Sequence, residues 1–106
     1  MQGYCVSYLF HCKPSKITEM KKLIKHVYHS SLQEKGCMEY RWYQSYEKPE
    51  DFLLFMTWES KTAFEDHVNS NHVQATHSGT TELPSLENVL QKPYRELTWK
   101  FIPVSS

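Results

Sequence analysis

The sequence predicts a small α+β domain built in the order β-α-β-β-α-β. Two apolar runs are separated only by the charged, proline-containing segment 47–50, which is typical of a hairpin. One helical pattern precedes this hairpin, another follows it, and further apolar runs lie near both ends of the chain. This order is the ferredoxin-like split pattern, for which we expect an antiparallel sheet with the strand order 4-1-3-2.

The first strand is expected over residues 3–12, where bulky side chains alternate with smaller ones. Ser15 follows this strand and is a candidate N-cap for a long helix. Apolar side chains recur at helical spacing over residues 17–32, and Gly36 is a suitable C-terminal stop. Two histidines on the polar face of this helix are interpreted as solvated side chains.

The central hairpin joins strands expected at 37–46 and 51–59. Ser60 comes directly afterwards and is a natural N-cap for the second helix of the pattern. A short helical turn is expected after residue 71, another short helix near 83–90, and a last strand over 94–102. We expect one domain over residues 1–106, with its core at about 3–102.

The second hairpin strand is apolar on both of its faces over residues 52–58, as is much of the first strand. An antiparallel strand with one face exposed to solvent should alternate apolar and polar residues instead. Since helices cover only one face in this fold, about three apolar side chains would stay wet at a cost of roughly 1.5–3 kcal/mol each. That sum rivals the ~5–15 kcal/mol stability of a whole domain. We therefore expect a homodimer formed through the sheet face.

Composition excludes several classes of protein. The chain has 106 residues with 12 basic and 12 acidic side chains, and no basic block that would attract nucleic acid. No run approaches the ~20 apolar residues of a membrane helix, and no signal peptide is recognisable, so we expect a cytoplasmic protein without a membrane partner. The three cysteines include no Cys-x-x-Cys pair and are interpreted as free thiols.

Several motifs resemble those of the antibiotic biosynthesis monooxygenase (ABM) family, essentially over residues 3–102. The matching elements are Gly36-Cys37-x-x-Tyr40-x-x-Tyr43-x-Ser45, Pro49-x-x-Phe52, Trp58-Glu59-Ser60-x-x-Ala63, and the later His67 and His72. The resemblance implies a dimeric α+β barrel. Some members oxidise quinols or polyketide phenols with dioxygen and without metal or flavin. Others isomerise phosphorylated sugars of the autoinducer-2 pathway, a related branch binds and degrades haem, and some have no known substrate.

His67 and His72 are the candidate catalytic residues. His67 lies on the apolar stripe of its helix, so it is either a core histidine or a general base in a pocket. His72 follows a polar segment, so it is either a loop residue that caps the helix or a group at the pocket mouth. The resemblance implies histidine at both positions. Their spacing of five does not suit two ligands on one helical turn, so no metal site is expected.

Ser7, Tyr43, Trp58 and His77 are candidate substrate-binding residues. The two aromatic side chains either stack on a planar substrate or simply pack in the sheet. Haem-degrading relatives bind haem iron through a histidine that matches His77, together with an asparagine in the first strand and a tryptophan in the second helix. Here Ser7 and His67 stand at those two places. One element of three is present, so no cofactor is expected and haem is kept as an alternative.

The sequence thus predicts an oxidoreductase of the quinol monooxygenase-like branch, acting on a quinol or related phenol without a cofactor. Alternatives from other classes are an isomerase of a small phosphorylated sugar, a haem-binding or haem-degrading protein, and a non-catalytic dimeric ligand-binding protein. The isomerase would need a lysine or arginine for the phosphate, which the sequence does not locate. The expected partners are a second copy of the chain and a small aromatic or quinol-like ligand.

Overall fold

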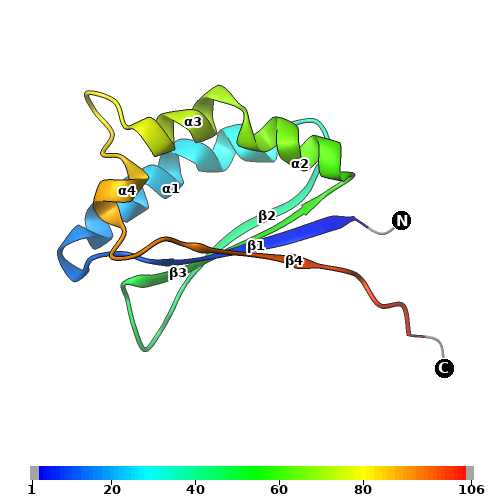
Figure 1. Cartoon of the computed structure of the whole chain (residues 1–106), viewed down its shortest axis with the longest axis horizontal. Helices are drawn as coiled ribbons and strands as arrows, with labels where there is room; N and C mark the ends of the chain where they lie inside the picture. Colours follow the sequence, from blue (N-terminus) through cyan, green and yellow to red (C-terminus); the bar gives the residue numbers. More distant parts are fainter. Residues whose placement is uncertain (1–2, 105–106) are drawn as a thin grey trace.

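The computed structural model describes residues 3–104, and it consists of one sheet with helices on one face (Figure 1). The elements in order are β1 (Tyr4–His11), a 3₁₀ turn (Pro14–Lys16), α1 (Ile17–Leu32), β2 (Cys37–Gln44), β3 (Asp51–Trp58), α2 (Lys61–Val68), α3 (Asn71–Ser78), α4 (Leu86–Val89) and β4 (Arg95–Trp99). The strands pair in the order β2-β3-β1-β4, and every pair is antiparallel. The predicted ferredoxin-like fold and its strand order are therefore confirmed.

The two predicted helix caps have different outcomes. Ser60 is the N-cap of α2, because its Oγ accepts a hydrogen bond from the backbone N–H of Ala63 at 3.1 Å. Ser15 does not cap α1, because it lies inside the 3₁₀ turn that precedes the helix. The N-cap of α1 is Lys16, whose side chain makes no capping hydrogen bond. Pro14 favours such a turn, since proline fits the first turn of a helix.

The second helix of the predicted pattern is interrupted near its middle. α2 ends at Val68 with Asn69 as its C-cap, and Ser70 takes an extended conformation with φ −68° and ψ 154° before α3 begins. The Ser70 hydroxyl donates to the carbonyl oxygen of His67 at 2.6 Å, so it satisfies one of the carbonyls left over at the end of α2. The turn expected after residue 71 is thus a full helix, α3, which changes direction relative to α2 (Figure 1).

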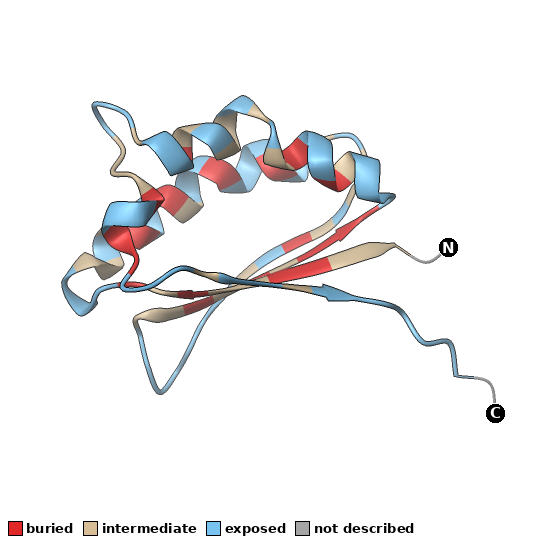
Figure 2. Cartoon of the chain, viewed as in Figure 1, coloured by how far each residue is buried: buried red, intermediate tan, exposed pale blue. Residues whose placement is uncertain are grey.

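The core fills the space between the helices and the sheet (Figure 2). Strands β1 and β3 are the central strands, and alternate side chains along them point toward the helices. The side chains of Val6, Met56 and Trp58 are completely buried on that face, where Met20 from α1 is almost completely buried as well. All three cysteines are free thiols, and no helix of the described chain is long and apolar enough to cross a membrane.

The other face of the sheet has no helix over it within residues 3–104 (Figure 2). It carries the side chains that alternate with the core residues, including the partly buried Leu53 and Phe55 of β3. On the same face, the indole Nε1 of Trp99 in β4 donates to Ser7 Oγ in β1 at 2.7 Å. The expected apolar content of the second face is present, although Ser7 and Thr57 make it more polar than the helix side.

The last strand is shorter than the sequence predicted. β4 pairs with β1 from Arg95, opposite Leu9, to Trp99, opposite Cys5. Strand β1 begins at Tyr4, so the residues after Trp99 have no partner strand in the described chain. Their apolar side chains are accordingly exposed, with Ile102 at 74% and Val104 at 91%.

Candidate functional site

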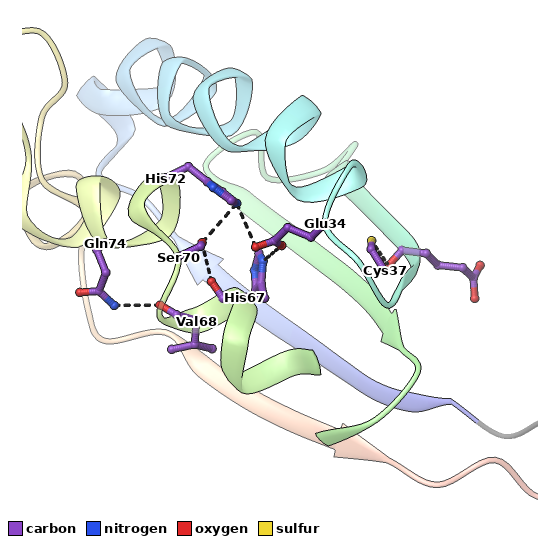
Figure 3. Close-up of polar contacts among 8 residues, drawn as sticks. Glu34, Cys37, His67, Val68, Ser70, His72 and Gln74 are labelled. Atoms are coloured by element: carbon purple, nitrogen blue, oxygen red, sulfur yellow. Dashed lines mark hydrogen bonds and ion pairs between the residues drawn. The ribbon is translucent and has the colours of Figure 1, made fainter. Parts of the chain in front are cut away.

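His67 is a buried histidine that faces the sheet from α2. Its side chain is 3% exposed, and its ring lies 4.6 Å from that of Trp58 and 5.8 Å from that of Tyr40 between ring centroids. Its Nδ1 lies 2.5 Å from Oε2 of Glu34, in the segment between α1 and β2 (Figure 3). A carboxylate accepts hydrogen bonds, so this contact assigns the ring proton to Nδ1 and leaves Nε2 as an acceptor.

His72 reaches the same carboxylate from the start of α3. Its Nε2 lies 3.3 Å from Glu34 Oε1 and 3.2 Å from Ser70 Oγ (Figure 3). The two imidazole rings are 6.1 Å apart between centroids. The break between α2 and α3 turns His72 toward Glu34, so one carboxylate joins both predicted histidines.

The electrostatics of this cluster favour a neutral His67. Burial lowers the pKa of His67 to about 4, so its imidazole is uncharged near pH 7. Burial also lowers the pKa of His72 and raises that of Glu34, although the attraction between these two groups works against both shifts. A neutral imidazole whose Nδ1–H is held by a carboxylate can take a proton at Nε2, and the resulting imidazolium is stabilised by that carboxylate.

The ring of His67 borders a small apolar cavity between the helices and the sheet. The volume of this cavity is about 60 Å³. Its walls include four aromatic side chains besides the buried Tyr40, namely Tyr8, Phe10, Trp42 and Tyr94. His77 and Leu86 also line it, and these two residues together with Tyr94 line a larger groove outside. The cavity therefore adjoins the surface at this wall.

The other predicted site residues lie in different places. His77 of α3 lines the cavity. Trp58 does not line the cavity. It is fully buried on β3 and packs against the ring of His67. Ser7 alternates with Tyr8 along β1, so it points to the opposite face of the sheet and binds Trp99 there. Tyr43 is 49% exposed and lines a separate groove beside the edge strand β2.

Glu34 is the residue of this cluster that the sequence did not predict. It is separated from His67 by 33 positions, and only the fold brings the two side chains together. It lies in the turn that follows α1, two residues before Gly36, where the first family motif begins. A glutamate in the turn after a helix is usually a solvent-exposed side chain, so the sequence pattern alone does not predict a role for Glu34.

Glu34, His67 and His72 also form a group with metal-binding chemistry. One ligand atom from each lies within 4.8 Å of the other two, and a pair of histidines with a carboxylate suits zinc. The two histidines lie on separate helices, so their spacing of five in the sequence does not prevent them from binding one metal ion. The 2.5 Å distance between Glu34 Oε2 and His67 Nδ1 is nevertheless that of a direct hydrogen bond. Two ligands of one tetrahedral zinc stand ~3.3 Å apart, so metal binding would require Glu34 to move.

The comparisons with known proteins agree on the fold and the family. The sequence profile described as "Antibiotic biosynthesis monooxygenase" matches residues 3–79. Among solved structures, PA3566 from Pseudomonas aeruginosa is 17% identical with a TM-score of 0.86, and 97% of each chain is covered. A conserved protein from Methanosarcina mazei Go1 is 25% identical with a TM-score of 0.83, covering 93% of this chain and 92% of that one.

A structure named as an antibiotic biosynthesis monooxygenase is 16% identical with a TM-score of 0.84, covering 94% of this chain and 99% of that one. No curated protein matches the chain significantly. The profile match spans well over half of the sequence, and the expected resemblance is therefore confirmed: the chain belongs to the antibiotic biosynthesis monooxygenase family.

Proposed function

We propose that this protein is a monooxygenase of the ABM type that oxidises a phenol or quinol with dioxygen, the electrons coming from the substrate itself. The observation that carries the proposal is the neutral, buried His67, which has its Nδ1 bound to Glu34 and its ring at the wall of an aromatic cavity. Family membership supports the same reaction class.

In the proposed reaction, the substrate ring lies in the cavity and its hydroxyl faces Nε2 of His67. Nε2 takes the phenolic proton, and Glu34 stabilises the imidazolium that forms. The electron-rich phenolate then reacts with dioxygen at a ring carbon that carries hydrogen, forming a carbon–oxygen bond. One oxygen atom stays on the ring as a quinone carbonyl, and the other leaves as water. The substrate supplies all four electrons that dioxygen takes up, so no external reductant is needed.

The walls of the cavity favour a phenol over the alternatives. No lysine or arginine lines it, so a phosphorylated sugar would find no cation for its phosphate. A volume of about 60 Å³ is far too small for haem. It is also below the ~150 Å³ of an engineered cavity that binds benzene, so a phenol ring requires the wall at His77, Leu86 and Tyr94 to move outward.

The proposal includes a homodimer that covers the open face of the sheet. Leu53 and Phe55 on β3 and the half-exposed Trp99 on β4 form an apolar surface on that face. Burying such side chains against a second copy stabilises the assembly by roughly 25 cal/mol per Å² of apolar surface. A two-fold axis brings the same surface of both chains together.

The decisive experiment measures dioxygen consumption with menadiol as the probe, at pH 7 and corrected for autoxidation. His67→Ala should lower turnover by roughly 10²–10⁴-fold, the usual value of a positioned base. His26→Ala, an exposed histidine on α1, is the matched control and should keep the wild-type rate. Turnover should persist after treatment with EDTA. A wild-type rate in His67→Ala, or a rate that returns only with added metal or haem, would contradict the proposal.

A further inference from the structure

A second hollow lies between α1 and the edge strand β2, and the proposed reaction does not use it. Its volume is about 580 Å³, within the usual ~300–1,000 Å³ of small-molecule sites. Only Ile24 and Trp42 are shared between its walls and those of the catalytic cavity, so these two side chains form the partition. None of Glu34, His67, His72 and His77 borders it. We call this hollow the α1–β2 groove.

The α1–β2 groove concentrates positive charge in a chain that is neutral overall. Lys21 and Lys25 stand one helical turn apart on α1, and Arg41 borders the groove from the edge strand β2. No aspartate or glutamate is among its lining residues. Within residues 3–104, neither lysine takes part in an ion pair, while Arg41 Nη2 lies 3.6 Å from Oε2 of Glu39. The groove thus keeps most of its cationic charge available to a ligand.

The same groove offers aromatic surfaces. Tyr28 is 37% exposed and Tyr43 is 49% exposed, so both rings can be reached from solvent. Trp42 also borders the groove and stacks on Phe10 of the core at 5.4 Å between ring centroids. That packing holds the indole in place, which lowers the entropy lost when a ring binds against it. Exposed aromatic rings beside cations suit a planar ligand with an acidic group.

We propose that the α1–β2 groove is a binding site for a small aromatic anion. The ring of the ligand lies on the side chains of Tyr28 and Trp42, and its acid group is held by Lys21, Lys25 and, at the sheet edge, Arg41. The guanidinium of Arg41 can bind a carboxylate, sulfonate or phosphate through two parallel hydrogen bonds, and the lysines add point charges. This site is distinct from the cavity beside His67 and does not depend on the proposed reaction.

The test uses 2-naphthoate as the probe and its neutral amide, 2-naphthamide, as the matched ligand. Calorimetric titration of the wild-type protein should show binding of the anion that weakens with added salt, with the amide bound at least about fivefold more weakly. Lys21→Gln, Lys25→Gln and Arg41→Gln should each weaken naphthoate binding by about two- to fivefold, as expected for exposed ion pairs. Lys22→Gln, on the same helix but outside the groove, should leave the affinity unchanged.

Amide chemical shifts locate the ligand independently of these variants. Naphthoate should perturb residues 21–29 and 41–43 in the NMR spectrum, while Val73 and Thr76 beside the catalytic cavity remain unchanged. Equal binding of acid and amide, the same loss of affinity in Lys22→Gln, or shifts confined to the cavity would overturn the proposal. None of these outcomes depends on whether the protein oxidises menadiol, so the two proposals fail separately.

Discussion

The two ring nitrogens of His67 have different surroundings, and that difference underlies the proposed chemistry. Nδ1 is held by Glu34 at 2.5 Å, whereas Nε2 has no such partner in the proposed reaction and takes the proton of a phenol in the apolar cavity that His67 lines. Burial keeps the ring neutral, which a base requires, and the carboxylate prepares it to accept charge. His72 contacts the second oxygen of the same carboxylate and so restricts its orientation.

Glu34→Gln tests this positioning role at the level of one atom. The amide keeps the size of the side chain but removes the charge that stabilises the imidazolium. We expect the turnover number with menadiol to fall by about 10- to 100-fold, from the loss of a hydrogen bond to a charged group. The apparent pKa of the base in the pH–rate profile should also fall. Glu65→Gln, an exposed residue of α2, is the control and should change neither quantity.

The stability of the protein should depend on pH through His67. Its folded-state pKa of about 4 lies below the unfolded value of about 6.5, so only the unfolded chain takes up the proton between these values. The free energy of unfolding should therefore fall as the pH decreases from 6.5 to 4, by an amount on the order of 2–3 kcal/mol. Urea unfolding of the wild type at several pH values measures this loss.

The variant His67→Gln isolates that contribution, since it retains Glu34 and His72. Its free energy of unfolding should fall less steeply over the same pH range than that of the wild type. Parallel curves for the two proteins would mean that His67 is protonated in the folded state, and the proposed neutral base would then be wrong.

Among the elements, α2 depends on a single side chain for its start. Ser60→Ala removes the hydrogen bond from Oγ to the N–H of Ala63, which should lower the free energy of unfolding by about 1 kcal/mol. Ser15→Ala is the matched control, because Ser15 makes no capping bond and should change the stability little. Urea denaturation followed by circular dichroism compares the two. A loss of equal size in both variants would contradict the assignment of the cap.

The break between α2 and α3 determines how His67 and His72 are oriented relative to each other. A continuous helix would carry His67 and His72 on different faces, since positions five apart are separated by well over one turn. The extended Ser70 and its bond to the carbonyl of His67 redirect the chain, and both rings then reach Glu34. The short polar segment between the helices is thus what assembles the cluster.

At the scale of the whole molecule, the open sheet face determines the predicted assembly. Light scattering at micromolar concentration should give about twice the 12.6 kDa mass of one chain. Phe55→Lys should shift the mass toward that of the monomer while circular dichroism stays native-like, because Phe55 is on the open face. Met56→Lys should instead unfold the chain, since Met56 is completely buried under the helices. A wild-type monomer, or a Phe55→Lys dimer, would refute the proposed interface.

The sequence by itself determined the order of the elements and the strand order of the sheet. Those features depend on local periodicity and short connections, such as the apolar alternation of β1 and the compact hairpin between β2 and β3. The sequence also identified Ser60 as a helix cap and His67 as a residue on the buried face of a helix, because both features depend on the pattern of only a few neighbouring residues. The family motifs lie in the same local segments and were recognisable for that reason.

Only the tertiary structure decided which side chains meet. Glu34 reaches two histidines of other helices, a relation between segments 33 or more residues apart that no local pattern encodes. Because successive side chains of a strand point to opposite faces, Ser7 lies on the face opposite Tyr8. Tyr43 lines the α1–β2 groove because β2 is an edge strand. β4 ends at Trp99 because pairing requires a partner strand, and β1 extends no further. Contacts through space depend on the packed arrangement of whole elements, which the sequence specifies only through the complete fold.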